Sequence, residues 1–420
     1  MVNSELALFG GKPTRLSLFP KYPVIDEQEE MAVIEVLKSK KLSTFVASPG
    51  ENFLGGEKIK QFEQNFATYI GTKYAISFNS ATSALHAAIV SVEVQPGEEV
   101  IVPPYTFTST ATSALMHNAI PVFSDVTLDT FCLDPKKLKK VLTPLTSAII
   151  PVHLFGHPCE MDEILEFALE NDLKVIEDCA QAPGAKYKGT KVGNFGNCGI
   201  FSFQETKNMM TGEGGMLVTN DENIAKIAQM IRNHGEMILK SDTQRKYKSE
   251  ILGWGYRMTE MEAAIGIVQL SKLNSMNETR KKLADFLTQK LNIIEGLHHT
   301  KYQHVDHAYY VYALTYDEEK IGIPREKFCE AVRSEGIPFF GGYVKPLYLN
   351  PLYQERKAFA FKHYKGNVNY DEGICPNTEN LHNKKLILTP VVRPPATIED
   401  MKDIVNAIEK VIKNKEELLE

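Results

Sequence analysis

The chain has 420 residues, of which 43% are hydrophobic and 24% charged, as in ordinary globular proteins, and its length predicts two domains. The formal net charge of −6 and the lack of a long basic run argue against a nucleic-acid surface. No apolar run approaches the roughly 18 residues that span a bilayer, and the start of the sequence lacks a signal-peptide pattern. The six cysteines are scattered without metal-ligand spacing, so we expect a cytoplasmic protein with reduced thiols, no membrane contact and no metal.

Strand and helix patterns alternate through the first two thirds of the chain, after an extended arm at residues 1–25 that is rich in Gly and Pro. This alternation is typical of βαβ units and predicts an α/β fold with a largely parallel sheet. The predicted helices are 27–38, 57–69, 80–92, 108–117 and 160–171, and the predicted strands are 74–78, 100–102, 121–123, 148–152, 174–178, 199–203 and 216–220.

The last third has a different rhythm, beginning with a long helix from about residue 260 and a short strand at 308–314. A final helix starts with Thr397 followed three residues later by Asp400, which is a capping-box pattern. We therefore expect an N-terminal arm at 1–25, a large domain at 26–275 and a smaller C-terminal domain at 276–420.

One lysine, Lys207, lies in a loop between two predicted strands, within GIFSFQETKNMMTGEGGMLVTN at 199–220. A loop lysine is usually solvated. Here Ser202 precedes it, and the glycines that follow it let the backbone pass close to a bulky group, which favours a lysine held in a pocket. Such a lysine is the usual anchor of a carbonyl cofactor through a Schiff base.

Three further segments follow predicted strands, and ligands of open α/β sheets bind beyond the carboxyl ends of strands. In FNSATSA (78–84), a strand runs into a helix whose first amides form either a phosphate site or a plain N-cap. Asp178 ends an apolar strand, either as a helix cap or as a functional carboxylate. PPYTFT (103–108) places aromatic rings after another strand. With Lys207, these segments supply the parts of a site for pyridoxal 5'-phosphate.

Several ordered blocks carry a resemblance to a known family, namely SFNSATSAL, IVPPYTFTSTA, IPVHLFGHPCEMDEI, VIEDCAQAPGA, FSFQETKNMMTGEGGMLVTN, IRNHGE and LGWGYRMTEMEAAI. On these blocks the chain resembles the DegT/StrS family of sugar aminotransferases, within the fold type I (aspartate aminotransferase-like) pyridoxal phosphate enzymes. The resemblance implies a large domain with a mostly parallel central sheet and a smaller C-terminal α+β domain.

The resemblance also assigns roles to individual residues. Lys207 forms the Schiff base and then moves protons, and Asp178 pairs with the pyridine nitrogen of the cofactor. Gln181 bonds the phenolic oxygen, and Phe107 rather than Tyr105 stacks on the ring. The phosphate is held by Ala81, Thr82 and Ser83, at the turn into the helix that begins near residue 80, and by Ser202, in the strand before the lysine loop.

The sequence departs from the family at Gly255, where many members carry an asparagine that contacts the phosphate of the neighbouring subunit. The resemblance implies that residues 254–258 complete the partner's site in a homodimer, with the side-chain contact from position 255 either absent here or replaced by a backbone N–H or another group. Arg257 is a candidate for binding the carboxylate of the amino donor or, equally, for a structural salt bridge.

Three hypotheses for function follow. The first is transfer of an amino group from glutamate or glutamine to a nucleotide-linked keto sugar in amino-sugar biosynthesis. The second is the same reaction on a keto-cyclitol or another polyol ketone, which LALFGGKP (6–13) and the long segment before Cys375 favour. The third is a non-catalytic regulator, against which Lys207 argues, because such a protein has no need of that amine.

Overall fold

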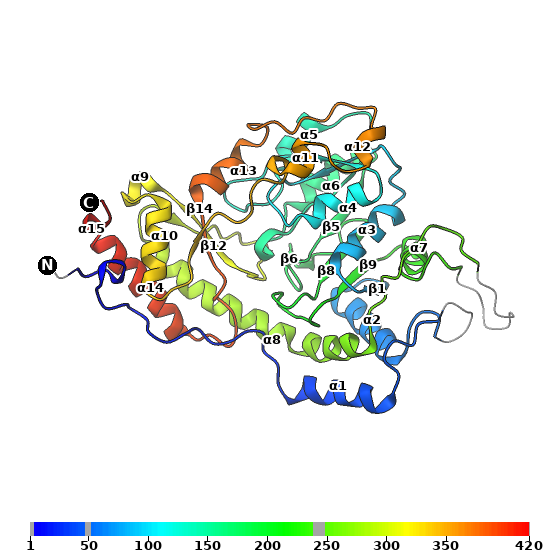
Figure 1. Ribbon diagram of the computed structural model, residues 1–420, viewed down its shortest axis with the longest axis horizontal. Helices are drawn as coiled ribbons and strands as arrows, with labels where there is room; N and C mark the ends of the chain where they lie inside the picture. The colour runs from blue at the N-terminus through cyan, green and yellow to red at the C-terminus, as the bar shows by residue number, and fades with distance from the viewer. Residues whose placement is uncertain (1–3, 47–51, 238–247, 420) are drawn as a thin grey trace.

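A seven-stranded sheet lies at the centre of the protein, in the order β1-β9-β8-β5-β4-β2-β3 (Figure 1). The structure is a computed structural model that describes residues 4–46, 52–237 and 248–419. Strands β3, β2, β4, β5 and β8 run parallel, whereas β9 is antiparallel to both of its neighbours. The strands are β1 (Tyr74–Phe78), β2 (Glu99–Val102), β3 (Ile120–Phe123), β4 (Thr146–Ile149), β5 (Lys174–Asp178), β8 (Cys198–Ser202) and β9 (Gly215–Thr219).

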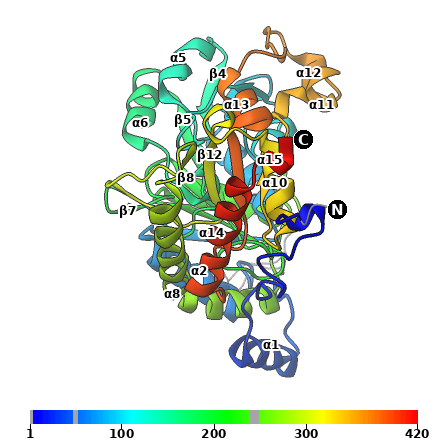
Figure 2. The ribbon, with the colours of Figure 1, turned by 90° about the vertical axis from the view of Figure 1, so that its left-hand side faces the viewer.

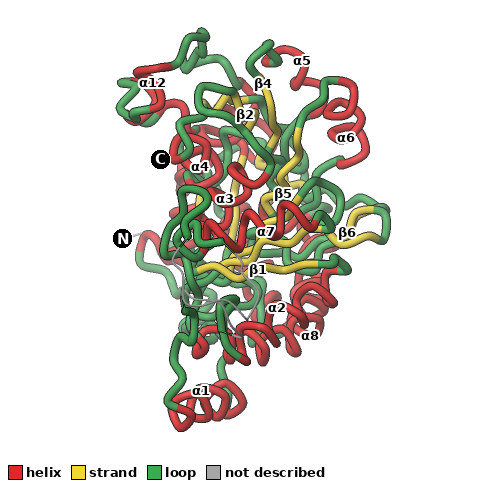
Figure 3. The backbone as a smooth tube through the Cα atoms, turned by 90° about the vertical axis from the view of Figure 1, so that its right-hand side faces the viewer, coloured by secondary structure: helices red, strands yellow, loops and turns green. Residues whose placement is uncertain are grey.

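Helices cover both faces of this sheet, which explains why its strands are almost continuously apolar. One face packs against α3 (Ala81–Ser91), α4 (Ser109–Met116) and α7 (Glu222–Arg232) (Figure 3). The other face packs against α2 (Glu57–Ile70), α6 (Met161–Glu170) and the first half of α8 (Glu260–Leu291). Successive residues of a strand serve opposite faces, as Ala75 and Ile76 of β1 do.

A second, antiparallel sheet has the order β10-β12-β14-β13 and packs with α10, α14 and the last half of α8 around a separate core (Figure 2). The capping box predicted at Thr397 and Asp400 is confirmed at the start of α14. Helix α8 runs without a break through residue 275, and the division into domains at that position stays a prediction. The elements are β10 (Leu297–His298), β12 (Tyr312–Tyr316), β13 (Phe340–Gly341), β14 (Leu386–Thr389), α10 (Arg325–Ser334) and α14 (Ile398–Lys413).

Helix α1 (Glu27–Ser39) packs along α8 and stands out from the rest of the molecule (Figure 1). Within the described ranges no helix combines the length and apolarity needed to cross a membrane. The remaining elements are a small sheet of β11 (Val305–Asp306), β6 (Lys186–Tyr187) and β7 (Thr190–Lys191), and the short helices α5 (Leu138–Val141), α9 (Glu318–Ile321), α11 (Pro351–Gln354), α12 (Ala360–His363), α13 (Pro376–Asn380) and α15 (Glu416–Leu419).

The strand predicted at 308–314 is wrong in its first half, since β12 begins only at Tyr312. The residues before it bond to a loop instead. The amide of Ala308 donates to the carbonyl of Gly156 at 2.9 Å, and that of Tyr310 to the carbonyl of Phe155 at 2.8 Å. These bonds bring Tyr310 to the carboxyl end of the central sheet, beside the site described next.

Candidate active site

A cavity of about 440 Å³ opens where β1, β2, β5 and β8 end, at the carboxyl edge predicted to bind a ligand. It gathers residues from all four sequence segments singled out above. Its lining is Ser80, Ala81, Thr82, Thr106, Phe107, Ser109, Val152, Asp178, Ala180, Gln181, Ser202, Gln204, Thr206, Lys207, Glu213, Tyr310 and Tyr343.

The turn from β1 into α3 presents free backbone donors to this cavity. Ser80 is the N-cap, and its Oγ accepts the amide of Ser83 at 3.1 Å. In the described part of the chain, the amides of Ala81 and Thr82 have no partner, and both residues line the cavity. The hydroxyl of Ser83 instead donates to Oδ1 of Asn79 at 2.7 Å, and Ser83 does not line the cavity. The turn is therefore both an N-cap and a site suited to an anion.

Gly215, the last of the glycines that follow Lys207, is required by a close backbone approach. A Cβ at this position would lie 2.4 Å from the carbonyl carbon of Ser80 and 2.5 Å from the amide nitrogen of Ala81. Strand β9 therefore packs directly on the first peptide of α3. The predicted close approach is to a bulky group, whereas at Gly215 the approach is between two backbone segments, and it fixes the position of the turn.

Asp178 ends β5 with its carboxylate in the cavity, only 4% exposed. Thr110 donates a hydroxyl to Oδ2 at 2.8 Å, and the amide of Ala180 donates to Oδ1 at 3.1 Å. Burial raises the pKa of this carboxyl above its ordinary value. The two hydrogen bonds and, after them, the positive charge of Lys207 act in the opposite direction and lower it, but burial dominates. No ion pair to Asp178 exists among the described residues, so the carboxylate can still receive a cationic group.

Gln181 presents its amide nitrogen to the cavity because its oxygen is already engaged. Its Oε1 accepts the amide of Phe155 at 2.7 Å, and its Nε2 donates to the hydroxyl of Tyr343 at 3.1 Å. The backbone of Phe155 has a φ of 57°, which is unusual for a residue other than glycine. The bond from Phe155 therefore fixes both a strained turn and the orientation of the Gln181 amide, whose second N–H stays available for an acceptor.

Lys207 lies half-buried in the loop after β8, with its Nζ 4.4 Å from the centre of the Tyr310 ring. No carboxylate is paired with this amine among the described residues. Its backbone is held on both sides, because its amide donates to the carbonyl of Gln204 at 2.9 Å and its own carbonyl accepts the hydroxyl of Tyr22. The amine is thus presented to the cavity from a fixed backbone.

The two aromatic candidates after β2 lie in different surroundings. Phe107 lines the cavity and is 57% exposed, which makes its ring available to stack on a planar ligand. Tyr105 is fully buried, and its hydroxyl accepts the amide of Tyr343 at 2.9 Å. Ser202, at the end of β8, is buried at the cavity wall.

Residues 254–258 lie beside the turn from β1 into α3 but do not line the cavity of their own chain. The carbonyl of Tyr256 accepts the amide of Asn79 at 2.9 Å, and Nη1 of Arg257 donates to Oδ1 of Asn233 at 3.5 Å. A Cβ at Gly255 would lie 3.4 Å from the His234 ring, which is ordinary contact. The described part of the chain therefore does not require glycine at position 255.

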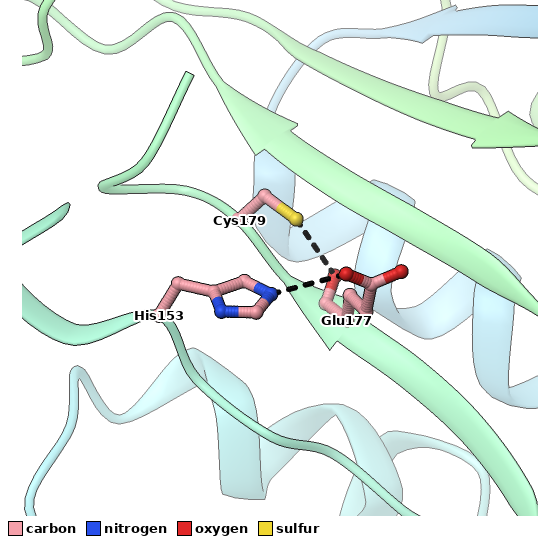
Figure 4. Close-up of side chains that lie close together, drawn as sticks. All are labelled: His153, Glu177 and Cys179. Atoms are coloured by element: carbon pink, nitrogen blue, oxygen red, sulfur yellow. Dashed lines mark hydrogen bonds and ion pairs between the residues drawn. The ribbon is translucent and has the colours of Figure 1, made fainter. Parts of the chain in front are cut away.

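A buried cluster of His153, Glu177 and Cys179 lies at the carboxyl end of β5 (Figure 4). Nδ1 of His153 accepts the amide of Cys159 at 3.0 Å, so its Nε2 carries the proton and donates to Glu177 at 3.1 Å. Burial raises the pKa of the Cys179 thiol well above its usual range. The hydrogen-bonding groups of His153 and Glu177 are therefore already used within the protein, as a hydrogen-bond network. The Glu177 oxygens also accept three backbone amides at 2.7–2.9 Å, from Gly193, Phe195 and Gly196.

Comparison with known proteins now defines the family. Residues 24–409 match the DegT/DnrJ/EryC1/StrS aminotransferase family. The chain belongs to this family. The family and the enzyme class predicted from the sequence are therefore confirmed, and the cofactor of the family is pyridoxal 5'-phosphate, as predicted.

Three similar proteins illustrate the breadth of the family. A GDP-perosamine synthase of Caulobacter vibrioides is 42% identical over 269 residues, which are 64% of this chain and 68% of that protein. A Streptoalloteichus tenebrarius protein, provisionally named an L-glutamine:3-amino-2,3-dideoxy-scyllo-inosose aminotransferase, is 34% identical over 359 residues, 84% of this chain and 83% of that protein. The X-ray structure of an aminotransferase from Psychrobacter cryohalolentis matches with a TM-score of 0.85 and 31% identity, covering 94% of this chain and 99% of that one. This last match confirms the predicted fold class.

The site contains residues that sequence reasoning did not single out. Thr110 lies one helical turn beyond Phe107, and the hydroxyl-rich TFTST run was the available signal for it. Tyr310 comes from beyond residue 300 and has no local signal, because only the tertiary fold brings it to the central sheet. Tyr22, in the N-terminal arm, reaches the Lys207 carbonyl from a still greater distance along the chain.

Proposed function

We propose that this enzyme holds pyridoxal 5'-phosphate in the cavity described above, with Lys207 as its covalent anchor through a Schiff base. One observation carries the proposal: an amine without an ion pair, a buried carboxylate without a cationic partner and free first-turn amides line a single cavity. These groups match the carbonyl, the protonated ring nitrogen and the phosphate of the cofactor. The free amides of Ala81 and Thr82, with the hydroxyl of Ser202, hold the phosphate.

The bound cofactor supplies an electron sink for the carbanion that forms when a proton leaves the substrate carbon. The protein contributes the remaining chemistry. Asp178 holds the ring nitrogen in its protonated form, Gln181 donates its spare N–H to the phenolic oxygen, and Phe107 covers the ring face. The amine of Lys207, once free, moves the proton between the substrate carbon and the cofactor carbon.

The proposed reaction transfers an amino group from glutamate or glutamine to a keto sugar linked to a nucleotide, in amino-sugar biosynthesis. The similarity to a GDP-perosamine synthase supports this substrate class. The reaction on a keto-cyclitol is the second candidate, and the similarity to the protein named as an inosose aminotransferase favours it. The family membership and the presence of Lys207 argue against a non-catalytic regulator.

A substrate screen distinguishes the two candidates. Purified enzyme, first loaded with the amino group from glutamate or glutamine, is offered nucleotide-linked keto sugars and keto-cyclitols, and the aminated product is identified by mass. We expect product with the nucleotide-linked sugars. Product with keto-cyclitols alone would replace the first candidate with the second, and no transfer from any donor would contradict the proposed reaction.

We further propose a homodimer in which residues 254–258 of each chain complete the site of the other. Arg257 supports this arrangement, because it belongs to this segment and does not line the cavity of its own chain, so that in a dimer it is free to bind the donor carboxylate in the partner's site. We also place the enzyme in the cytoplasm, which the six free and buried cysteines support.

A further inference from the structure

Arg280 is a buried arginine near the centre of α8, fully shielded from solvent and without a carboxylate partner among the described residues. Burial lowers the pKa of its guanidinium to about 10, so the group stays charged at neutral pH. An unpaired buried charge is costly unless its hydrogen bonds are satisfied. Two of its donors are used, at 3.0 Å to the carbonyl of Tyr309 and at 3.3 Å to the hydroxyl of Tyr22.

The hydrogen bond from Arg280 to Tyr22 links the guanidinium to the Lys207 backbone. A guanidinium can only donate, so the oxygen of Tyr22 is the acceptor in its bond with Arg280. Burial raises the pKa of Tyr22, which therefore keeps its proton. That proton is directed to the carbonyl of Lys207, the other partner of the hydroxyl. The guanidinium of Arg393 also packs on the Tyr22 ring, 4.0 Å from its centre.

The hydrogen bond from Arg280 to the Tyr309 carbonyl links the guanidinium to the Lys207 amine, because Tyr310 is the next residue. The bond from Arg280 fixes the Tyr309 carbonyl, and the next residue, Tyr310, places its ring 4.4 Å from Nζ of Lys207. The hydroxyl of Tyr310 is held by Oγ1 of Thr206 at 2.9 Å. One guanidinium thus fixes both the group that holds the lysine carbonyl and the ring that supports its amine.

We propose that Arg280 is a positioning residue for Lys207, acting on its carbonyl through Tyr22 and on its amine through Tyr310. The inference rests on the proposed role of Lys207 as the covalent anchor of the cofactor. It assigns a function to the N-terminal arm, which reaches the site through Tyr22. A misplacement of the amine by about 1 Å is enough to slow a reaction roughly a hundredfold.

The test compares the affinities of the cofactor-free protein for pyridoxal 5'-phosphate and pyridoxamine 5'-phosphate, because only the first has a carbonyl that can bond to Lys207. Tyr22→Phe should weaken pyridoxal phosphate binding about threefold to tenfold, the effect of one lost hydrogen bond. Pyridoxamine phosphate binding should stay within about twofold, because the phosphate turn is unchanged. Arg280→Met should show a larger effect, and Arg280→Lys, which can keep one contact, an intermediate one.

Tyr316→Phe is the matched control. The Tyr316 hydroxyl is also buried and also donates to a backbone carbonyl, that of Ile323 at 2.7 Å, but it lies in β12, within the second core. This variant should bind both compounds as the wild type does. If Arg280→Met does not fold, Tyr22→Phe and Arg280→Lys still decide the question.

Equal weakening of both compounds would show a merely structural role, and unchanged affinity for both would remove the role altogether. Either result overturns the inference. Peptide mapping of borohydride-reduced wild-type enzyme separates these results from failure of the proposed function. A label on another lysine would contradict the proposed anchor itself, whatever the variants show.

Discussion

The hydroxyl of Thr110, in the first turns of α4, donates to Oδ2 of Asp178 at 2.8 Å. Thr110 is itself held at 3.1 Å by the hydroxyl of Thr106. This chain of hydroxyls fixes the carboxylate at the end of β5 without neutralising its charge. The charge therefore remains available to a cation in the cavity, and a buried carboxylate without such a partner destabilises the fold.

Asp178→Asn should reduce transamination by about 10²–10³-fold, as expected when a charge that stabilises the transition state is removed. The amide can keep the geometry, because the Thr110 hydroxyl can either donate or accept. The rate of the half-reaction with the amino donor, followed in a single turnover, measures the effect. A variant with near-normal turnover would show that Asp178 does not pair with the ring nitrogen.

The same substitution should stabilise the cofactor-free protein at neutral pH. Burial raises the folded pKa of Asp178 above its ordinary value of 3.8, so the group contributes stability below pH 3.8 and loses that contribution as the pH rises through the raised pKa. Asparagine has no charge to lose. The Tm of Asp178→Asn should therefore exceed that of the wild type at pH 7, with the difference shrinking toward pH 4. Equal Tm values at pH 7 would contradict the raised pKa.

Gly215→Ala should disturb the phosphate turn, because its Cβ would lie 2.4 Å from Ser80 and 2.5 Å from Ala81. We expect the preference for pyridoxamine 5'-phosphate over pyridoxamine to fall roughly tenfold, the effect of a weakened charge-assisted contact. Gly212→Ala is the control in the same loop, because a Cβ at position 212 would enter open space. Its φ of +88° is strained for alanine, so this variant should lose about 1 kcal/mol of stability through backbone strain alone. A preference unchanged in Gly215→Ala would mean that the turn does not hold the phosphate.

Gly255→Asn introduces the asparagine that the family resemblance implies for this position. Because a Cβ there makes only ordinary contact with His234, the variant should fold with a Tm close to that of the wild type. If residues 254–258 reach the phosphate of the partner's cofactor, the new amide should tighten pyridoxamine 5'-phosphate binding about twofold to tenfold. Unchanged affinity in a folded variant would show that position 255 does not reach that phosphate.

The sequence predicts this fold well where local patterns decide it. Apolar runs buried on both faces predict the seven strands of the central sheet to within about three residues, and β5 matches its predicted bounds at 174–178. The helix cap at Thr397 is also predicted, whereas the short strands β6 and β7 are not. The strand at 308–314 is placed wrongly because its first residues bond to the loop of Phe155 and Gly156, which no local pattern encodes.

The same distinction holds for the site. Lys207, Asp178, Gln181 and Phe107 follow strand ends and are brought into one cavity as expected. Arg280, Tyr22 and Tyr310 contribute through contacts between segments that are far apart in sequence. An arginine within an amphipathic helix predicts a solvated or ion-paired side chain, so neither its burial nor its two tyrosine partners could be predicted from the sequence.

Mixing two inactive variants tests the proposed composite site. Lys207→Ala removes the covalent anchor from one chain, and Arg257→Ala removes the arginine that we propose its partner contributes. A mixed dimer would pair both defects in one site and leave the other intact, so equal amounts with random exchange should recover up to about a quarter of wild-type activity. If Arg257→Ala alone remains active, a bulky substitution at Gly255 takes its place. Suppose that both single variants are inactive and that mass measurements confirm exchange of subunits. If mixing then recovers no activity, residues 254–258 serve only their own chain.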